Sequence, residues 1–302
     1  MATIESHSYD ADNRSNSPFR FVGEMLRYPA KIRTHRALVW NFYKREFYGR
    51  FRGSFLGMFW VLVHPIFLFA IYYVVFGVLF KARSANGAPP MHYSMFLFVG
   101  IIAWTAFIET VLRGITLVVE NGNLIQKVSF PAELLPLHLV TVNLIVYGVG
   151  VLVYLAIAAL TSFALPGWNL LGLPFVIAVQ AVFSLGFTLL LAACYVFVRD
   201  ILQVFPILAQ FWFFATPVFW LPQMLEGNAS LAPLASAMNW NPMYLILSGH
   251  RAALGATHHF VQDSTFWDVL RFAGLAAIPA FLTFMLGYSV FRSLQHRFAD
   301  EV

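Results

Sequence analysis

Three arginines in the segment "REFYGRFRGSFLGMFW" have the chemistry needed to hold phosphate groups. Arg45, Arg50 and Arg52 stand just before an apolar run that begins at residue 57. A guanidinium can donate two parallel hydrogen bonds to two phosphate oxygens, and it stays charged at physiological pH. A basic cluster beside an apolar segment is typical of contact with anionic membrane headgroups. The sequence therefore predicts phosphate-binding chemistry at headgroup depth.

Glu109 and Arg113 form a second candidate, four residues apart inside an apolar stretch. On a helix this spacing puts both side chains on one face, acidic residue first, so that they can neutralise one another. Ionisable residues inside a membrane segment are functional candidates. Two interpretations stay open: a functional charge, and a structural ion pair at a helix or dimer interface.

No pattern in the sequence is typical of a catalytic or metal centre. A transferase acting on lipid-linked sugar would need paired carboxylates on one aqueous surface. The candidates are scattered singly, at Glu109, Glu120, Glu133 and Asp200. His258, His259 and Asp263 lack the spacing of a metal site, and one cysteine, Cys194, excludes an internal disulfide. We predict no catalytic residue and no metal ligand, and a membrane-embedded transferase remains the competing class.

The composition is that of an integral membrane protein. Hydrophobic residues make up 60% of the 302 residues, charged residues only 11%, and the mean hydropathy is +0.71. Residues 1–56 hold ten Lys/Arg and five Asp/Glu, a net of +5, which is the net charge of the whole chain. The basic excess is therefore an N-terminal, membrane-adjacent feature, and we expect no nucleic-acid partner.

Apolar stretches predict an all-α protein with six transmembrane helices. They lie near 57–80, 94–119, 137–161, 173–198, 203–221 and 269–291. We expect a flexible cytoplasmic leader at 1–29, an amphipathic interface helix at 30–56 and a transmembrane domain at 57–302. With this topology fourteen Lys/Arg fall inside and four outside, so both termini are predicted to be cytoplasmic.

Two connecting regions carry further predictions. In the lead-in helix, helical spacing groups five apolar residues on one side, and a turn at Gly53–Gly57 bends the chain into the first span. The five are Val39, Phe42, Tyr43, Phe47 and Phe51. In the connection at 222–268, "NWNPMYLILSGHRAAL" has an apolar core too short to cross a bilayer. A re-entrant helix and a helix on the outer surface both remain possible, with Asn241, Pro242 and Arg251 as outer gate candidates.

Four segments carry a resemblance to a known family. "REFYGRFRGSFLGMFW" leads into a span with a proline at 65, "NLIQKVSFPAELLPL" follows the second span, "VRD" the fourth, and "NWNPMYLI" precedes the sixth. Together, over roughly residues 38–295, they resemble the ABC-2 permeases that export polysaccharide, and the O-antigen branch best. Capsule and teichoic acid permeases are more distant relatives.

The resemblance implies partners and a cargo. It implies a homodimer that encloses a channel, two copies of a separate ABC ATPase, and an undecaprenyl-diphosphate-linked glycan as cargo, in a multi-pass protein of the bacterial inner membrane. The chain has no G-x-x-x-x-G-K-[ST] motif, so ATP and Mg²⁺ would be bound by the ATPase and no cofactor is expected here. A different cargo, such as capsule, teichoic acid, lipid or drug, is the alternative within the same family.

The resemblance also assigns roles to residues. Arg45, Arg50 and Arg52 would recognise the diphosphate, and binding of anionic phospholipid remains an equal alternative for them. The loop at 121–134 would couple the permease to the ATPase, through Gln126, Lys127, Phe130, Pro131 and Glu133. Aromatic rings can pack on the apolar faces of sugars, so Tyr72, Phe211 and Phe214 are candidates for lining a channel, against the alternative of an interfacial aromatic belt.

Overall fold

The computed structural model describes residues 22–79, 90–127, 131–161, 165–222, 232–256 and 264–301. Within these ranges the chain forms helices and no strand, which confirms the predicted all-α class. The α-helices are α1 (Val22–Leu26), α2 (Tyr28–Thr34), α3 (Arg36–Arg50), α4 (Trp60–Tyr72), α5 (Pro90–Ile115), α6 (Leu117–Glu120), α7 (Gly122–Lys127), α8 (Pro136–Leu160), α9 (Leu173–Phe197), α10 (Ile201–Ala215), α11 (Ala232–Met238), α12 (Pro242–Leu254), α13 (Phe266–Leu294) and α14 (Phe298–Glu301).

Short helices of other types extend several of these. The 3-10 helix η2 (Gly57–Phe59) leads into α4, and the π-helix η3 (Tyr73–Leu79) continues it. The remaining 3-10 helices are η4 (Ala132–Leu134), η5 (Trp168–Gly172) and η8 (Gln295–Arg297).

Five helical segments are long and apolar enough to cross a membrane. They are Gly57–Leu79, Met91–Ile115, Ala132–Leu160, Trp168–Phe197 and Phe266–Arg297. Each is 23 residues or longer, and an α-helix of 20 residues already spans about 30 Å. They coincide with five of the six predicted spans.

The remaining predicted span, the fifth in chain order at 203–221, is only partly helical. Helix α10 has 15 residues, which corresponds to about 22 Å, and it ends at Ala215. Thr216 is extended (φ −99°, ψ 135°) because it precedes Pro217, whose ring disfavours a helical conformation in the residue before it. The apolar run that predicted a continuous helix therefore contains a helix end.

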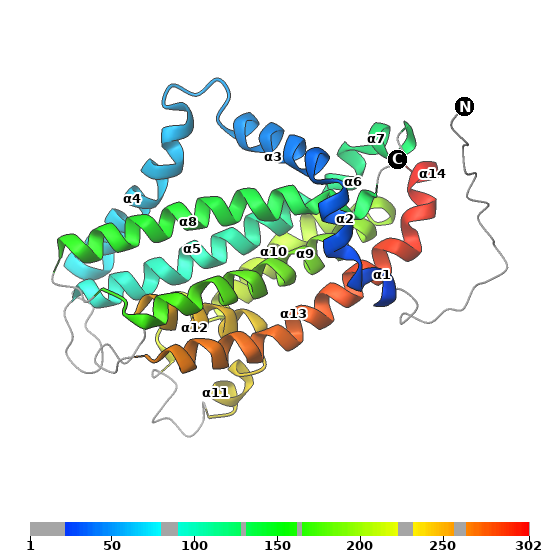
Figure 1. The fold of residues 1–302 in the computed structure, drawn as a ribbon. Helices are drawn as coiled ribbons and strands as arrows, with labels where there is room; N and C mark the ends of the chain where they lie inside the picture. Colours follow the sequence, from blue (N-terminus) through cyan, green and yellow to red (C-terminus); the bar gives the residue numbers. More distant parts are fainter. Residues whose placement is uncertain are drawn as a thin grey trace.

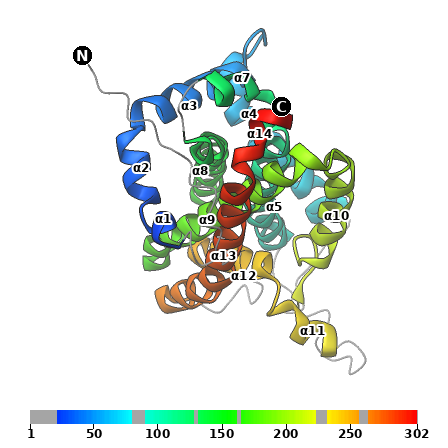
Figure 2. The same ribbon diagram turned by 90° about the vertical axis from the view of Figure 1, so that its right-hand side faces the viewer.

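The long helices form one bundle (Figure 1). Helices α5, α8, α9 and α13 run beside one another, and α6, α7 and α14 gather at the carboxyl end of α5. Figure 2 shows α1 and α2 on one side of the bundle and α10 on the other. Helices α9 and α13 approach closely because both carry glycine: a Cβ on Gly287 would lie 2.1 Å from the carbonyl oxygen of Gly186.

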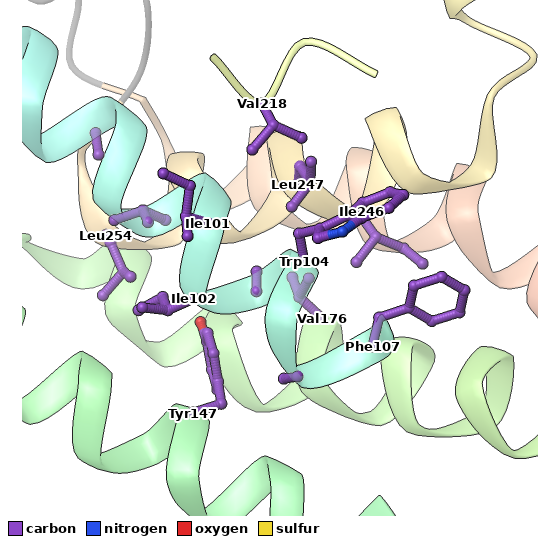
Figure 3. Close-up of a cluster of buried hydrophobic side chains, with 14 of the residues drawn as sticks. Ile101, Ile102, Trp104, Phe107, Tyr147, Val176, Val218, Ile246, Leu247 and Leu254 are labelled. Atoms are coloured by element: carbon purple, nitrogen blue, oxygen red, sulfur yellow. The ribbon is translucent and has the colours of Figure 1, made fainter. Parts of the chain in front are cut away.

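The main hydrophobic core lies where α5, α8, α9 and α12 meet (Figure 3). Trp104 and Phe107 of α5 are buried beside Val176 of α9 and Ile246 of α12. Ten of the thirteen residues of α12 are buried, and this helix contacts α5, α9 and α13. The segment predicted to be re-entrant or surface-lying is therefore packed inside the protein.

The lead-in to the bundle differs in detail from the prediction. The first described residues, from Val22 on, are already helical although they belong to the segment predicted as a flexible leader, and Met25 and Tyr28 are buried. Helix α3 ends before a turn in which Gly53 and Gly57 take positive φ angles (80° and 51°), which confirms the predicted glycine turn. The apolar side of α3 packs against α8, with Phe47 in contact with the cluster that contains Val61 and Val142.

Candidate functional site

A polar cavity lies beneath α3 at the carboxyl end of α5. Its volume is about 570 Å³. Helix α3 forms one wall with Arg45, Glu46, Gly49 and Arg50; the other walls are formed by Arg113, Leu117, Glu120, Asn121, His138 and Leu139. Two of the three arginines predicted to bind phosphate therefore face one cavity, and the structure adds Arg113 to them.

Arg45 and Arg113 are held at the rim by neutral and acidic partners. Arg45 Nη2 donates to Asn121 Oδ1 at 3.1 Å, and its guanidinium lies over the ring of Phe42. Arg113 lies 3.6 Å from Glu46 and 3.8 Å from Glu120, and its side chain is about half exposed. Both guanidinium groups thus keep a face toward the cavity.

The ion pair predicted between Glu109 and Arg113 is replaced by pairs with other helices. Glu109 Oε2 accepts from Arg50 Nη1 at 3.3 Å, whereas Arg113 contacts Glu46 and Glu120. The reason is that Arg50 and Glu46 of α3, which folds back over the end of α5, and Glu120 of α6 come within 3.8 Å of Glu109 or Arg113. Both residues are in ion pairs, but the predicted pairing with each other is wrong.

Arg50 connects the polar cavity with a smaller one. Its Nη2 donates to Asn143 Oδ1 at 3.1 Å, and both Asn143 and Glu109 line a cavity of about 30 Å³ between α4, α5 and α8. His64 and Tyr147 also line this small cavity. Arg50 therefore lines the polar cavity and contacts two residues that line the small one.

Arg52 does not belong to this group. It is exposed, follows the end of α3, and is not among the residues that line either cavity. The sequence suggested that the three arginines act alike, but only Arg45 and Arg50 line the cavity, and Arg52 lies outside it.

The predicted coupling residues are described only in part. Gln126 and Lys127 lie at the end of α7, their side chains are outside the described residues, and so is Phe130 altogether. Pro131 is the residue before η4, with an extended ψ of 94°.

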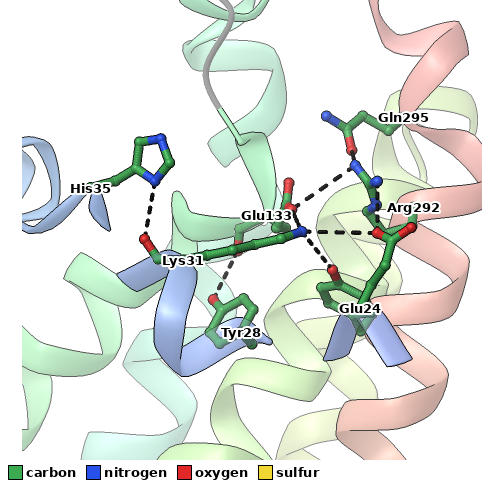
Figure 4. A network of polar contacts seen from close by, with 8 residues as sticks. Glu24, Tyr28, Lys31, His35, Glu133, Arg292 and Gln295 are labelled. Atoms are coloured by element: carbon green, nitrogen blue, oxygen red, sulfur yellow. Dashed lines mark hydrogen bonds and ion pairs between the residues drawn. The ribbon is translucent and has the colours of Figure 1, made fainter. Parts of the chain in front are cut away.

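Glu133, in contrast, is fully buried in a charged network (Figure 4). Its Oε1 accepts from Lys31 Nζ at 2.7 Å and lies 4.0 Å from Arg292, while Tyr28 donates to its backbone carbonyl at 2.9 Å. Arg292 also holds Glu24 at 2.8 Å. The Glu133 side chain is therefore engaged inside the protein and is not a surface contact for a partner.

This network binds the N-terminal helices to the rest of the bundle. Burial alone lowers the pKa of Lys31, but its hydrogen bonds to Glu133 and Tyr288 outweigh burial, so the pKa of Lys31 is raised. Burial, together with the nearby charge of Glu133, raises the pKa of Tyr28. Lys31 therefore stays protonated, and the contact between α2 and the segment before α8 persists at neutral pH.

The outer gate candidates have structural partners. Asn241 caps α12: its side chain accepts from the backbone of Met243 at 3.1 Å, accepts from Trp212 Nε1 at 3.0 Å and donates to Thr216. Pro242 occupies the first turn, where its missing N–H costs nothing. The two residues start α12 and attach it to the end of α10.

Arg251 is buried near the amino end of α5 and is only 3% exposed. Its guanidinium donates to the carbonyls of Phe96 (3.3 Å), Pro217 (2.8 Å) and Val218 (3.1 Å). It also lies 3.5 Å from the ring centre of Phe96. Gly100 makes this approach possible, because a Cβ there would lie 2.3 Å from Arg251 Nη2.

The channel candidates lie on α4 and α10. Phe211 and Phe214 are largely exposed on α10, and Tyr72 is half-buried against Phe76 and Phe219. Exposure alone does not distinguish contact with lipid, a second subunit or a channel, so their role stays a prediction.

Sequence reasoning missed a buried polar chain between α8, α12 and α9. Tyr147 and His250 Nδ1 are 2.7 Å apart, and His250 Nε2 lies 2.6 Å from Gln180 Oε1. Gln180 in turn donates to the carbonyl of Ala103 at 2.9 Å. Polar residues isolated in apolar runs were the signal that could have found them.

Among the described residues, no three His, Cys, Asp or Glu side chains gather as metal ligands. His258, His259 and Asp263 lie outside the described residues. Glu46 and Glu120, which line the polar cavity, and Glu109, which lines the small one, are each in contact with an arginine.

Five membrane-length apolar helices define a multi-pass membrane protein, and the cavity lined by arginines gives it a polar site at the carboxyl end of α5. The chain belongs to the ABC-2 type transporter family, whose profile matches residues 37–254. This range includes the cavity and α12. Membership of this family implies a partner ATPase subunit.

Curated relatives are permeases. The chain is 29% identical over 278 residues to the O-antigen export system permease protein RfbA of Myxococcus xanthus, covering 92% of this chain and all of that protein. Two proteins of the same name from Klebsiella pneumoniae are 23% and 22% identical, each over 83% of this chain and 89% of their own length.

Proposed function

We propose that this chain is the membrane-spanning permease of an ABC transporter that exports lipid-linked O-antigen across the bacterial inner membrane. Two copies would enclose the channel, and two copies of a separate ATPase would drive it. The family match and the export function in the names of three relatives support this assignment. The diphosphate between lipid and glycan is the group that this permease must handle at the membrane surface.

The observation that carries the site assignment is the convergence of Arg45, Arg50 and Arg113 on one cavity of about 570 Å³. Three guanidinium groups match a ligand with several negative charges, because each can donate two hydrogen bonds to phosphate oxygens. The apolar side of α3 packs on α8, so the cavity lies between this interface helix and the bundle. A diphosphate at headgroup depth would enter there while its lipid stays in the bilayer.

Single substitutions of two arginines on the same lead-in segment test this site. Arg45→Gln should cut surface glycan strongly, because each charge-assisted contact contributes about 1.5 to 3 kcal/mol to binding. Arg52→Gln, a matched control outside the cavity, should leave export near the wild-type level. Membrane levels of both variants are compared by immunoblot, and equal export by the two would contradict the assignment.

We further propose six membrane crossings with both termini in the cytoplasm, the fifth made by α10 and the residues after it, and α12 re-entrant. The burial of α12 among α5, α9 and α13 supports this, as does the fourteen-to-four distribution of basic residues. In a Cys194→Ser background, Ser129→Cys and Ala299→Cys should resist a membrane-impermeant thiol reagent in intact cells, whereas Gly87→Cys should react. Labelling of Ser129→Cys would contradict the topology.

The segment 121–134 is proposed to contact the ATPase, with Phe130 as its anchor. Truncation of a hot-spot aromatic costs about 2 kcal/mol or more, so Phe130→Ala should sharply reduce co-purification of the ATPase. Phe298 is unsuitable as a control, because it is fully buried against Phe291. Phe55, which is fully exposed, is suitable, and equal loss in Phe55→Ala would remove the assignment.

A further inference from the structure

Arg50, which lines the cavity, donates hydrogen bonds to two different side chains. Its two terminal nitrogens are occupied separately, one by Glu109 at 3.3 Å and one by Asn143 at 3.1 Å. Asn143 is buried and donates its amide to Thr110 at 3.0 Å, which leaves its oxygen aimed at Arg50. The guanidinium is therefore fixed in one orientation before any ligand binds.

The partner of Arg50 is itself an anion that can be released. The Glu109 side chain is 45% exposed, and it lines the small cavity of about 30 Å³, which has room for a water molecule. A carboxylate that loses Arg50 can thus be solvated where it stands. Asn121, the hydrogen-bond partner of Arg45, is neutral, so a ligand displaces no charge there.

We propose that Glu109 is an internal competitor for the phosphate site: it occupies Arg50 in the ligand-free permease, and a phosphate ligand binds by displacing it. This inference rests on the proposed diphosphate site and adds its regulation. Glu109 engages one N–H of Arg50 and places a negative charge beside it. A ligand that takes this donor must break the Arg50–Glu109 pair, so every anion binds more weakly than it would to an arginine without this neighbour.

Such competition sets a threshold that separates two kinds of membrane lipid. A phosphodiester headgroup carries one negative charge and merely replaces the charge of Glu109. A diphosphate carries more charge and also reaches Arg45 and Arg113. The competitor weakens both ligands by the same factor, so the phospholipid falls below the affinity needed to occupy the cavity, whereas the diphosphate still binds through its further contacts with Arg45 and Arg113.

The test measures binding to the purified permease–ATPase complex in detergent, with three probes: farnesyl diphosphate, inorganic pyrophosphate and dihexanoyl phosphatidylglycerol. Glu109→Gln should tighten binding of farnesyl diphosphate and of the phosphatidylglycerol by about fivefold each, the value for an ion pair of this exposure. Inorganic pyrophosphate, which carries the charge of the headgroup without the lipid, should show the same gain. Glu120→Gln removes one charge from the same cavity without releasing Arg50, and should give a smaller gain.

A double-mutant cycle shows whether Glu109 acts through Arg50. In an Arg50→Gln background the gain from Glu109→Gln should vanish. A gain that persists there, or an equal gain from Glu120→Gln, would overturn the inference and leave a general charge effect. If the wild-type complex binds farnesyl diphosphate no better than the Arg45→Gln complex does, the proposed site itself is overturned. Thermal unfolding of each variant excludes misfolding as the cause.

Discussion

Arginines near the two ends of α5 have opposite kinds of partners. At the carboxyl end, Arg50 and Arg113 face a cavity and contact carboxylates of α3, α5 and α6. Near the amino end, Arg251 is buried and donates to three backbone carbonyls. A carboxylate can exchange its partner for water or a ligand, whereas a buried carbonyl that loses its donor has no replacement. The first arrangement suits binding and the second suits fixation.

Removal of the buried cation, Arg251, is the most direct test of this difference. Arg251→Met keeps much of the side-chain volume but leaves three carbonyls without this donor, at about 1 to 3 kcal/mol for each group left unsatisfied. We expect a large fall in Tm of the purified protein and a low yield of monodisperse material. Arg52→Met, an exposed arginine, is the control, and similar Tm values for the two would show that Arg251 is dispensable.

The space that admits Arg251 is tested at Gly100. Gly100→Ala places a Cβ about 2.3 Å from Arg251 Nη2, and overpacking of this kind costs about 1 to 3 kcal/mol. Gly148→Ala in α8 meets nothing within 4 Å, so the better helix propensity of alanine should leave Tm unchanged or raised. A neutral Gly100→Ala would mean that the Arg251 guanidinium moves aside easily, contrary to a fixed Arg251.

Glu133 tests whether burial or location decides the role of a charge. It is buried, as Arg251 is, yet it lies outside the amino-end region of α5 that holds Arg251. Glu133→Gln removes the acceptor charge for Lys31 and should destabilise the protein by about 1 to 3 kcal/mol, with Glu120→Gln as the exposed control. Since the folded-state pKa of Lys31 is raised above 10.5, this contribution is complete below pH 10.5 and is lost as pH rises through the folded value. The gap in Tm between wild type and Glu133→Gln should therefore close only at higher pH.

The smallest effect on stability is expected at Arg113. Its side chain is 54% exposed, and exposed ion pairs contribute about 0 to 1 kcal/mol. Arg113→Gln should therefore shift Tm little while weakening binding of farnesyl diphosphate. A Tm loss as large as that of Arg251→Met would erase the distinction between the two regions.

The sequence predicted the long helices well because each is an uninterrupted apolar run of membrane length. It missed the end of α10 because "FWFFATPVFW" stays apolar through the break, although Pro217 marked it. For the site, charge pattern found Arg45 and Arg50. It could not pair Arg50 with Glu109 or Lys31 with Glu133, because these contacts join residues 59 and 102 positions apart and depend on how α2 and α3 fold onto the bundle.

The acceptors of Arg251 all precede it in the chain. Synthesis of the chain reaches Phe96, Pro217 and Val218 first. The guanidinium of Arg251 therefore enters the membrane after the carbonyls that offset the free-energy cost of burying it have been made. Chain order thus makes the acceptors available by the time the cation enters the membrane. A circularly permuted chain that began at α11 would reverse this order and present the cation to lipid before its acceptors existed.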